Sequence, residues 1–573
     1  MKVSDYVVEY LIEQGITDVF GYPGGMVTHL MDSFSKYNDK ICAHVNYNEQ
    51  ASAFAACAYA QVTGRTGVAY ATSGPGATNL ITGIANAYFD SIPTVFITGQ
   101  VNTYELSGSI GVRQKGFQET NIVEIVRPIT KAAYQVKDEK KIRYYLEKAF
   151  YEANSGRCGS VLLDIPMDIL KSDICRDELE ETLYSEVDEE TKITEVEIES
   201  VLLQQLSDSK RPCVILGNGI RNSGRLNELR QFLDKWKIPF VTSMIAFDIL
   251  HNSDKRYGFI GAYGDRCANF IVAKSDLIIS IGSRLDIRQV GADRANFAPN
   301  AKIIRVDIDL GELENKLHDT EMQINLSAKT FVEVLETVCI QHDFSDWLDI
   351  CNQIKETLNT IDDEELKSML NKLSRNLPQD CIVTTDVGQN QVWVAQSFEV
   401  KERQQFLFSG GHGAMGYALP AAIGGYYATK KPVYCIVGDG GLQMNIQELQ
   451  FIVREKIPIK ILVINNNALG MIRHFQDMYF NKNYYQTKPE GGYSSPDFTK
   501  IAMAYGIEAY SFDIFDIDSE KNIKRILNDD NACLIELRIN KDTYVYPKLE
   551  YGKPNQDQEP LIDRNMYDYL MDL

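Results

Sequence analysis

The sequence has little positive charge and no long uncharged hydrophobic run near its start. Lysine and arginine number 58 against 79 aspartates and glutamates, which gives a formal net charge of −21. Because nucleic-acid binding needs a clustered excess of lysine and arginine, we expect no nucleic-acid partner. The first residues, MKVSDYVVEYLIEQGITDVFG, carry acids among their apolar side chains. We therefore expect neither signal peptide nor membrane anchor, and a cytoplasmic location.

Cysteine pairs at metal-binding spacing are also missing. Eleven cysteines are scattered from Cys42 to Cys533 without a single CxxC pair. An odd number without regular spacing argues against a disulfide framework or a zinc site, and is typical of reduced thiols. The sequence has no evident short repeats or low-complexity tracts. The first and last thirds could be distant copies, which the pattern alone does not establish.

What the sequence does have is enough apolar content for several cores. It contains 573 residues, of which 44% are hydrophobic and 24% charged, a balance typical of soluble globular proteins. In the first third, a helical pattern at 3–13 precedes strand-like runs at 18–21, 67–72 and 94–98. Such alternation favours parallel sheets covered by helices.

We predict three consecutive doubly wound α/β domains over residues 1–175, 190–342 and 365–573. The acidic stretch 177–199 is predicted to be a solvated linker, because it is rich in glutamate and aspartate and poor in apolar residues. A charged, helical connector is predicted over 343–372.

Two turns in the last third carry the strongest chemical signal. "VYCIVGDGGLQMNIQEL" is a strand, a Gly-Asp-Gly turn and a helix, and "IKILVINNNALGM" is a second strand ending in asparagines. Because parallel strands present their carboxyl ends at one edge of a sheet, Asp439 and Asn466 should lie close together. Their side-chain oxygens suit Mg²⁺. The N–H groups after Gly440 and Gly441 suit a diphosphate.

Several further segments extend this signal to nearly the whole chain. They are "VFGYPGG", "NEQASAFAACAYAQVTG", "TSGPGATNLITGIANAYFDSIP", "GFQE", "VLLDIP", "TTDVGQNQ" and "GAMG". Together with the Gly438–Asn466 motif of thiamine-dependent enzymes, they resemble the catalytic subunit of acetolactate synthase. The resemblance implies a pyrimidine-binding, a central FAD-type and a diphosphate-binding domain. It also implies a homodimer or homotetramer with active sites between chains, and a possible small regulatory subunit.

The resemblance implies a site for thiamine diphosphate (ThDP) and Mg²⁺. The metal would be held by the side chains of Asp439 and Asn466 and by the carbonyl of Ala468. The carbonyl of Gly413 would accept a hydrogen bond from the cofactor's 4′-amino group, and Met415 would separate its two rings. The other implied ThDP contacts are Gly74, Pro75, Gly76, Gln389, Gly438, Gly440, Gly441, Gly470 and Met471.

Glu49 is the residue on which we expect catalysis to depend most. It begins an alanine-rich helix, so its carboxylate should be poorly solvated, and burial raises a carboxyl pKa. In the family, a glutamate here bonds N1′ of the aminopyrimidine and so generates the base that deprotonates C2. Gln118, Gly413 and Met415 are the other implied catalytic residues. Phe117 belongs to the same loop as Gln118 and is assigned to the substrate.

The resemblance also assigns residues to a structural flavin and to an acceptor substrate. The positions that match FAD contacts are Arg157, Gly217, Gly219, Arg284 and Asp307. Arg288 matches the arginine that recognises the carboxylate of the second 2-oxo acid, for which a guanidinium is well suited. The chain departs from the family here, with Ile287 in place of an aspartate and Phe475 in place of a tryptophan.

The function implied is ThDP-dependent decarboxylation of pyruvate and transfer of the two-carbon unit to a second 2-oxo acid, which gives 2-acetolactate. The alternative is a carboligase of the same family that uses a different acceptor, such as a ketosugar or an aldehyde. A third possibility is a flavin oxidoreductase like pyruvate oxidase. A catalytically silent scaffold is disfavoured, because Glu49, Asp439 and Asn466 are all present.

Overall fold

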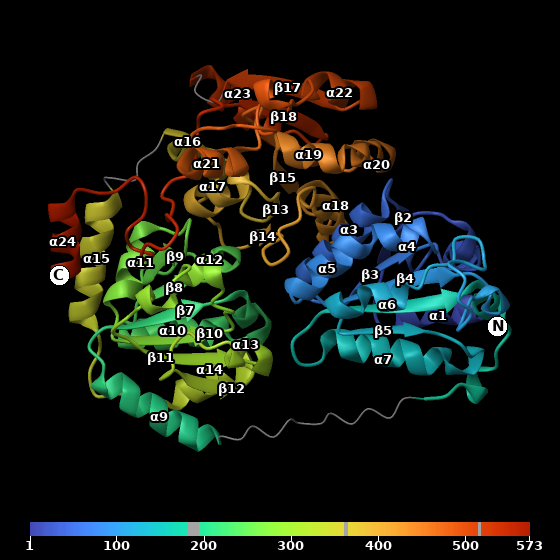
Figure 1. The fold of residues 1–573 in the computed structure, drawn as a ribbon, viewed down its shortest axis with the longest axis horizontal. Coiled ribbons are helices and arrows are strands. Elements are labelled where there is room, and N and C mark those ends of the chain that lie inside the picture. Colours follow the sequence, from blue (N-terminus) through green and yellow to red (C-terminus); the bar gives the residue numbers. More distant parts are fainter. Residues whose placement is uncertain (182–193, 360–364, 514–516) are drawn as a thin grey trace. The chain divides into compact units, whose positions relative to one another are not determined.

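The computed structural model describes residues 1–181, 194–359, 365–513 and 517–573. These residues form three six-stranded parallel sheets with helices packed against them (Figure 1). The three α/β domains predicted from the sequence are therefore confirmed, whereas their boundaries stay predictions. The first and third sheets belong to one compact unit, and the central sheet, with residues 544–573, belongs to another.

The first sheet has the strand order β2-β1-β3-β4-β6-β5. Its strands are β1 (Asp18–Gly21), β2 (Cys42–Val45), β3 (Gly67–Ala71), β4 (Thr94–Gln100), β5 (Ala132–Gln135) and β6 (Ser160–Pro166). Its helices are α1 (Val3–Glu13), α2 (Thr28–Lys36), α3 (Glu49–Thr63), α4 (Pro75–Asn79), α5 (Ile81–Phe89), α6 (Ile122–Val126), α7 (Ile142–Asn154) and α8 (Met167–Lys171).

The third sheet repeats this topology, with the order β14-β13-β15-β16-β18-β17. Its strands are β13 (Ile382–Thr385), β14 (Gln405–Leu407), β15 (Val433–Gly438), β16 (Ile459–Asn465), β17 (Glu508–Asp513) and β18 (Cys533–Arg538). The helices in this part of the chain are α17 (Gln389–Ser397), α18 (Ala418–Thr429), α19 (Asp439–Met444), α20 (Leu449–Glu455), α21 (Gly470–Tyr479), α22 (Phe498–Tyr505) and α23 (Ile517–Leu527). Chain order reverses between β13 and β15, and ligands of doubly wound sheets bind at such a switch point.

The central sheet has a different order, β12-β11-β10-β7-β8-β9, with the switch point between β10 and β7. Its strands are β7 (Pro212–Leu216), β8 (Phe240–Thr242), β9 (Arg256–Phe259), β10 (Leu277–Ile281), β11 (Lys302–Asp307) and β12 (Met322–Asn325). The remaining helices are α9 (Glu195–Asp208), α10 (Leu226–Trp236), α11 (Arg266–Lys274), α12 (Ile287–Val290), α13 (Leu310–Glu314), α14 (Ala328–Thr337), α15 (Ser345–Asn359), α16 (Glu365–Arg375) and α24 (Arg564–Asp572).

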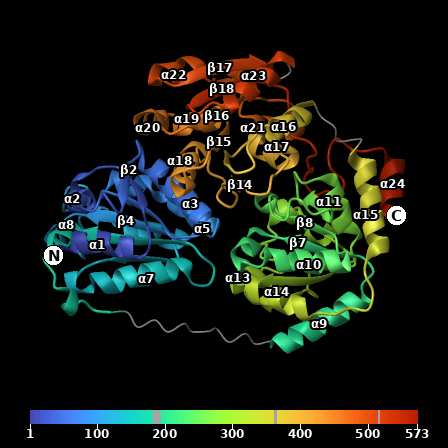
Figure 2. The same cartoon turned by 180° about the vertical axis from the view of Figure 1, so that it is seen from behind.

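The first and third sheets share one hydrophobic core, built around α3 and α18. The two helices lie side by side in both views (Figures 1 and 2). Small residues allow this close packing, because a Cβ on Gly424 of α18 would lie 2.0 Å from the backbone oxygen of Ala55 in α3. The helix that begins at Glu49 is therefore fixed from the side of the third sheet as well as from its own.

The segment between the first two domains differs in part from its expected form. Residues 182–193 of the predicted linker lie outside the described residues, but α9 begins at Glu195 and so includes the last part of that stretch. Thr194 and Glu197 form a capping box there, which favours helix despite the acidic composition. The C-terminal residues pack on the central domain, where Arg266 donates to the carbonyl oxygens of Gln558 and Pro560.

The connector predicted over 343–372 is helical in α15 and α16, while residues 360–364 lie outside the described part of the chain. None of the helices in the described ranges combines the length and the apolar composition that a membrane span requires.

Candidate active site

Asp439 and Asn466 follow two neighbouring strands of the third sheet. β15 and β16 pair in parallel with Gly438 opposite Ile464, so the residues that follow them emerge at one edge. Asp439 is 3% exposed and Asn466 7%. The turn chemistry seen in the sequence thus brings a carboxylate and an amide together at the switch point, where most of the third domain's predicted cofactor residues also lie.

Burial is the main influence on the Asp439 carboxyl and raises its pKa to about 6. A hydrogen bond of 3.1 Å from the hydroxyl of Tyr493 to Oδ2, and backbone N–H groups, oppose this shift. Tyr493 was not predicted as a site residue, because the sequence alone does not place its loop against β15. The hydroxyl orients the carboxylate and leaves it an oxygen donor for a cation.

Asn466 is fixed by bonds at both ends of its amide group. Its Nδ2 donates to Gln389 Oε1 at 2.8 Å, and its Oδ1 accepts from the N–H of Ala468 at 3.1 Å. Gly470 leaves the space for this contact, since a Cβ there would lie 1.7 Å from Gln389 Oε1. A carboxylate, an amide oxygen and a carbonyl form the hard oxygen set that Mg²⁺ prefers, so Asp439, Asn466 and Ala468 fit that ion.

The Gly413–Met415 segment is held over the same edge by Asp386, a residue that our sequence reasoning missed. Its fully buried carboxylate accepts from the N–H of Gly416 at 2.9 Å and from that of Ala418 at 3.0 Å. Burial raises the pKa of Asp386 to about 6, opposed by these bonds. Its position directly after β13, in "TTDVG", was the signal that could have found it.

The Gly413–Met415 segment contacts the Gly-Asp-Gly turn through one of its side chains. A Cβ on Gly440 would lie 3.2 Å from the methyl carbon of Met415, so this side chain packs against the Gly-Asp-Gly turn. Gly413 has a φ of 68°, a left-handed conformation that suits glycine, and no atom lies within 4 Å of where its Cβ would be. Met415 therefore contacts the turn, and Gly413 is bordered by open space.

Glu49 lies in a second cluster of predicted site residues, which follow the carboxyl ends of β2 and β3 in the first sheet. Its side chain is buried as predicted, with the residue 7% exposed, and Asn79 Nδ2 donates to Oε2 at 3.0 Å. A Cβ on Gly76 would lie 3.1 Å from Oε1 and one on Gly74 would lie 2.9 Å from Cβ of Gln118. The turn Gly74–Gly76 thus separates the carboxylate from the Gln118 loop.

The Gln118 loop is fixed by the residue that follows. Glu119 accepts from the N–H and hydroxyl of Ser107 and from the N–H of Lys115. Gln118 has a φ of 65°, which is unusual for a residue other than glycine. Phe117, assigned to the substrate, is 79% exposed.

The loop before Glu49 is anchored by Glu448, another residue that the sequence did not single out. Its fully buried carboxylate accepts from Asn46 Nδ2 at 2.9 Å and from the N–H of Tyr47 at 2.8 Å. Burial raises the pKa of Glu448 to about 7, although these bonds and Arg454 oppose the shift. This contact depends on the packing of two distant segments, so no local pattern could have revealed it.

The residues assigned to a flavin occupy corresponding strand ends in the central sheet. Gly217 and Gly219 follow β7, Arg284 follows β10, and Asp307 ends β11. The loops after β7 and β10 touch, because a Cβ on Gly217 would lie 2.0 Å from the oxygen of Gly282. The fifth residue, Arg157, follows α7 of the first domain, where its Nε donates to Ser91 Oγ at 2.8 Å.

The residues assigned to the acceptor are exposed. Arg288 lies on α12 with its backbone N–H bonded to Asp286, and Ile287 beside it is 63% exposed. Phe475 on α21 is 49% exposed and contacts the rings of Tyr479 and Phe480. Both surfaces are thus accessible to a solute.

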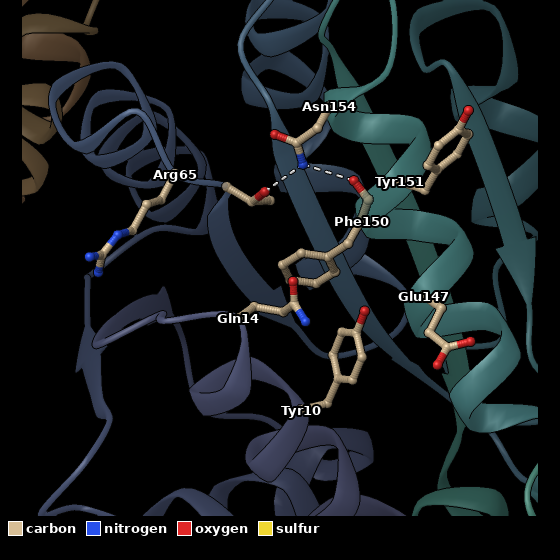
Figure 3. Close-up of a pocket in the computed structure, with 8 residues that line it drawn as sticks. Tyr10, Gln14, Arg65, Glu147, Phe150, Tyr151 and Asn154 are labelled. Carbon is tan, nitrogen blue, oxygen red and sulfur yellow. Dashed lines mark hydrogen bonds between the residues drawn. The ribbon is translucent and has the colours of Figure 1, made fainter. Parts of the chain in front are cut away.

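A surface hollow of about 510 Å³ lies elsewhere in the first domain. Figure 3 shows that α1 and α7 contribute most of its lining, which includes Tyr10, Glu147 and Phe150. Asn154 is engaged there by the hydroxyl of Thr66 and the oxygen of Phe150, both at 2.8 Å. None of the residues predicted for the cofactor or substrate lines this hollow.

Three models of thiamine pyrophosphate enzymes match the chain. The N-terminal TPP binding domain matches residues 1–125, the central domain 200–335 and the C-terminal TPP binding domain 386–537. The Gly-Asp-Gly turn and Asn466 fall within the last of these, and Glu49 and Gln118 within the first.

Curated relatives match the chain almost from end to end. The acetolactate synthase isozyme 2 large subunit of Escherichia coli is 35% identical over 97% of this chain and 99% of its own length. The acetolactate synthase large subunit of Lactococcus lactis is 35% identical over 96% and 94%. A probable acetolactate synthase large subunit of Methanocaldococcus jannaschii is 35% identical over 89% and 87%.

Proposed function

The chain belongs to the acetolactate synthase large-subunit family of thiamine pyrophosphate enzymes, and we propose on that basis that it makes 2-acetolactate. It decarboxylates pyruvate and transfers the two-carbon unit to a second 2-oxo acid. The structural observation that carries the proposal is the buried pair Asp439 and Asn466 at the ends of β15 and β16. The nature of the product rests on the similarity to acetolactate synthases over 97% of the chain.

ThDP, when bound, would supply a carbon nucleophile for the 2-oxo group and an electron-poor ring that takes up the electron pair released with CO₂. The chain's residues would hold this group through Mg²⁺, with Asp439, Asn466 and the carbonyl of Ala468 as the protein ligands. The N–H groups at the start of α19 would bind the diphosphate. Met415, packed against Gly440, and the open space at Gly413 shape the position of the ring system.

Glu49 is the proposed site of the proton exchange that this chemistry needs. Asn79 engages one oxygen of its carboxylate, which fixes the plane of the group and leaves Oε1 to exchange a proton with the aminopyrimidine. Burial removes competing water from that exchange. Gln118 borders the same turn, and its proposed role is to contact the substrate.

The assembly, the flavin and the acceptor site complete the proposal. We place the working active site between two chains of a homodimer or homotetramer, as the resemblance implies, with a small regulatory subunit as a further partner. FAD is proposed at the switch point between β7 and β10, beside Gly217, Gly219 and Arg284. The guanidinium of Arg288 is proposed to bind the carboxylate of the acceptor.

The test of the reaction is NMR product analysis after incubation with ¹³C-labelled pyruvate, ThDP and Mg²⁺. We expect labelled CO₂ and 2-acetolactate from the wild type, and neither from Asp439→Ala, which should also lose ThDP on gel filtration. Asp477→Ala, an acid in the same domain outside the proposed metal site, is the control. Full activity of Asp439→Ala would refute the metal site, and a product other than 2-acetolactate would refute the acceptor.

The acceptor site is tested separately with Arg288→Ala, for which Arg294→Ala is the matched control on a nearby loop. We expect Arg288→Ala to raise the KM for the second 2-oxo acid while pyruvate decarboxylation continues. Unchanged acetolactate kinetics in Arg288→Ala would remove this residue from the acceptor site.

A further inference from the structure

Three chemically reactive side chains lie in line on the first sheet, apart from every residue proposed for the cofactor. Cys42 and His44 lie on the edge strand β2, two residues apart and so on the same face. Cys42 Sγ lies 3.8 Å from His44 Nδ1, and His44 Nε2 lies 2.7 Å from Asp18 Oδ1 on β1. Thiol, imidazole and carboxylate thus form a continuous chain of hydrogen bonds.

The carboxylate determines which imidazole nitrogen carries the proton. Oδ1 of an ionised Asp18 can only accept, so neutral His44 must place its N–H at Nε2. The lone pair of Nδ1 then faces the thiol of Cys42. Oδ2 of Asp18 accepts from the hydroxyl of Thr17 at 2.7 Å, which fixes the carboxylate in turn.

The surroundings hold the imidazole in place while leaving the thiol accessible. His44 is 5% exposed and packs against the rings of Phe20 and Tyr427, with 3.7 Å between its centroid and that of Tyr427. Cys42 is exposed. Among the described residues, no group of three or more histidine, cysteine, aspartate or glutamate side chains is placed to hold a metal ion.

We propose that Cys42 is a nucleophilic thiol that takes up small, soft carbon electrophiles, with His44 as its general base and Asp18 as the residue that orients the base. This is the relation of nucleophile, base and orienting group found in thiol catalysis. With an alkyl halide, the sulfur–carbon bond forms as the carbon–halogen bond breaks and halide leaves. The thiol proton passes to Nδ1 of His44 and then to water.

The thiol is not a preformed thiolate. Although Cys42 is exposed, partial desolvation of its thiol and the carboxylates of Asp18 and Glu455 raise the pKa of Cys42, and Lys430 opposes them. Lys430 also lies over the ring of Tyr427, 3.7 Å from its centroid. Proton transfer to His44 during the attack is therefore what makes Cys42 reactive, and it predicts a distinctive pH profile. With increasing pH, the rate at Cys42 should therefore rise before the rate at an ordinary exposed thiol does.

The test is the rate of carbamidomethylation by iodoacetamide, measured for each cysteine by peptide mass spectrometry on the full chain. Cys175 is the internal control, since it is exposed on the same domain. At pH 7 we expect Cys42 to react at least about 10-fold faster than Cys175, as general-base help of this kind allows. His44→Gln should bring the two rates to within about twofold, and Asp18→Asn should have an intermediate effect.

Equal rates at Cys42 and Cys175 in the wild type would overturn the proposal, and so would an unchanged Cys42 rate in His44→Gln. If His44→Gln fails to fold, the wild-type pH profile decides. A Cys42 rate that begins to rise only with that of Cys175 would exclude His44 as the base. Cys42→Ser should keep acetolactate formation at the wild-type level, which separates this proposal from the proposed function.

Discussion

At the scale of single residues, the proposed chemistry depends on carboxyl groups that have been removed from water. Asp439, Asp386 and Glu448 are buried, and in each case burial raises the pKa while hydrogen bonds from neighbouring groups oppose the shift. Glu49 is also buried and has one oxygen engaged by Asn79. Despite this shared burial, the acids have different proposed roles. Asp439 binds the metal, Asp386 and Glu448 each hold a loop in place, and Glu49 exchanges a proton.

Glu49→Gln should separate proton transfer from binding. Glutamine keeps the size and the bond to Asn79 but cannot exchange a proton, so ThDP should still bind. Exchange of the cofactor's C2 proton, followed by NMR, should slow by about 10² to 10⁴. Asn79→Ala is the graded comparison, with a smaller loss, because it frees the carboxylate without removing it. Near-normal C2 exchange in Glu49→Gln would remove Glu49 from the reaction.

Glu448→Gln should change how stability depends on pH. The folded pKa of about 7 lies above the ordinary carboxyl value of 4.5, so the folded state holds this proton more tightly than the unfolded state does. Wild-type stability should therefore fall as pH rises from about 4.5 to 7, by an amount on the order of 3 kcal/mol from this group, and then level off. The variant should lack this component.

The measurement is the difference in unfolding free energy between wild type and Glu448→Gln across pH 4.5 to 8, which cancels the other titrating acids. Glu455→Gln, an acid on the adjoining helix α20, serves as the control. A wild-type-minus-variant difference that does not vary with pH would contradict the raised pKa.

At the scale of elements, three glycines pack closely against α3. A Cβ on Gly67 would lie 2.1 Å from the oxygen of Ala56, and one on Gly83 would lie 2.1 Å from Cβ of Ala53. Gly424 makes the third close approach, to Ala55. Two of these three approaches meet backbone atoms of the helix that presents Glu49, and backbone atoms cannot move aside as side chains do.

Gly424→Ala should destabilise the chain by about 2 to 3 kcal/mol, because the added methyl meets a backbone carbonyl. Gly425→Ala is the matched control on the same helix. Its Cβ would meet the side chains of Ile382, at 3.2 Å, and Leu407, at 3.8 Å, which can move. Chemical denaturation should show a loss well under half as large for Gly425→Ala, and equal losses would contradict the assigned packing.

The sequence predicted these elements to different degrees. The strands and the turns at 438–441 and 466 follow from local patterns, so their common edge could be inferred from parallel topology alone. Asp386 also had a local signal, in its place at a strand end. Glu448 and the Cys42–His44–Asp18 chain did not, because each joins segments that only tertiary packing brings together.

At the scale of the whole molecule, the sequence predicted three consecutive domains, but it did not predict that the first and third share one hydrophobic core. The repeated strand order of the first and third sheets, which composition could not establish, is plain in the topology. Their common core around α3 and α18 makes them one structural unit, while residues 544–573 join the central domain. Long-range packing of this kind leaves no periodic trace in the sequence.

The shared core predicts that the first and third domains unfold together. Hydrogen exchange on the full chain should give amides in α3 and α18 the same opening free energy, because neither helix can lose the other and stay buried. Gly424→Ala should lower both values by the same amount and leave β10 of the central domain unchanged. A separate change in α3 or α18 alone would contradict the common unit.

The same core has a consequence for synthesis on the ribosome. The apolar face of α3 is complete once residue 63 has emerged. The helix that buries this face, α18, is complete only at residue 429. At translation rates of about 5 to 20 residues per second, that face waits on the order of a minute for its partner. During this interval the nascent first domain exposes a surface to which another nascent chain's α18 could bind instead, so newly made chains should depend on chaperones until residue 429 is released.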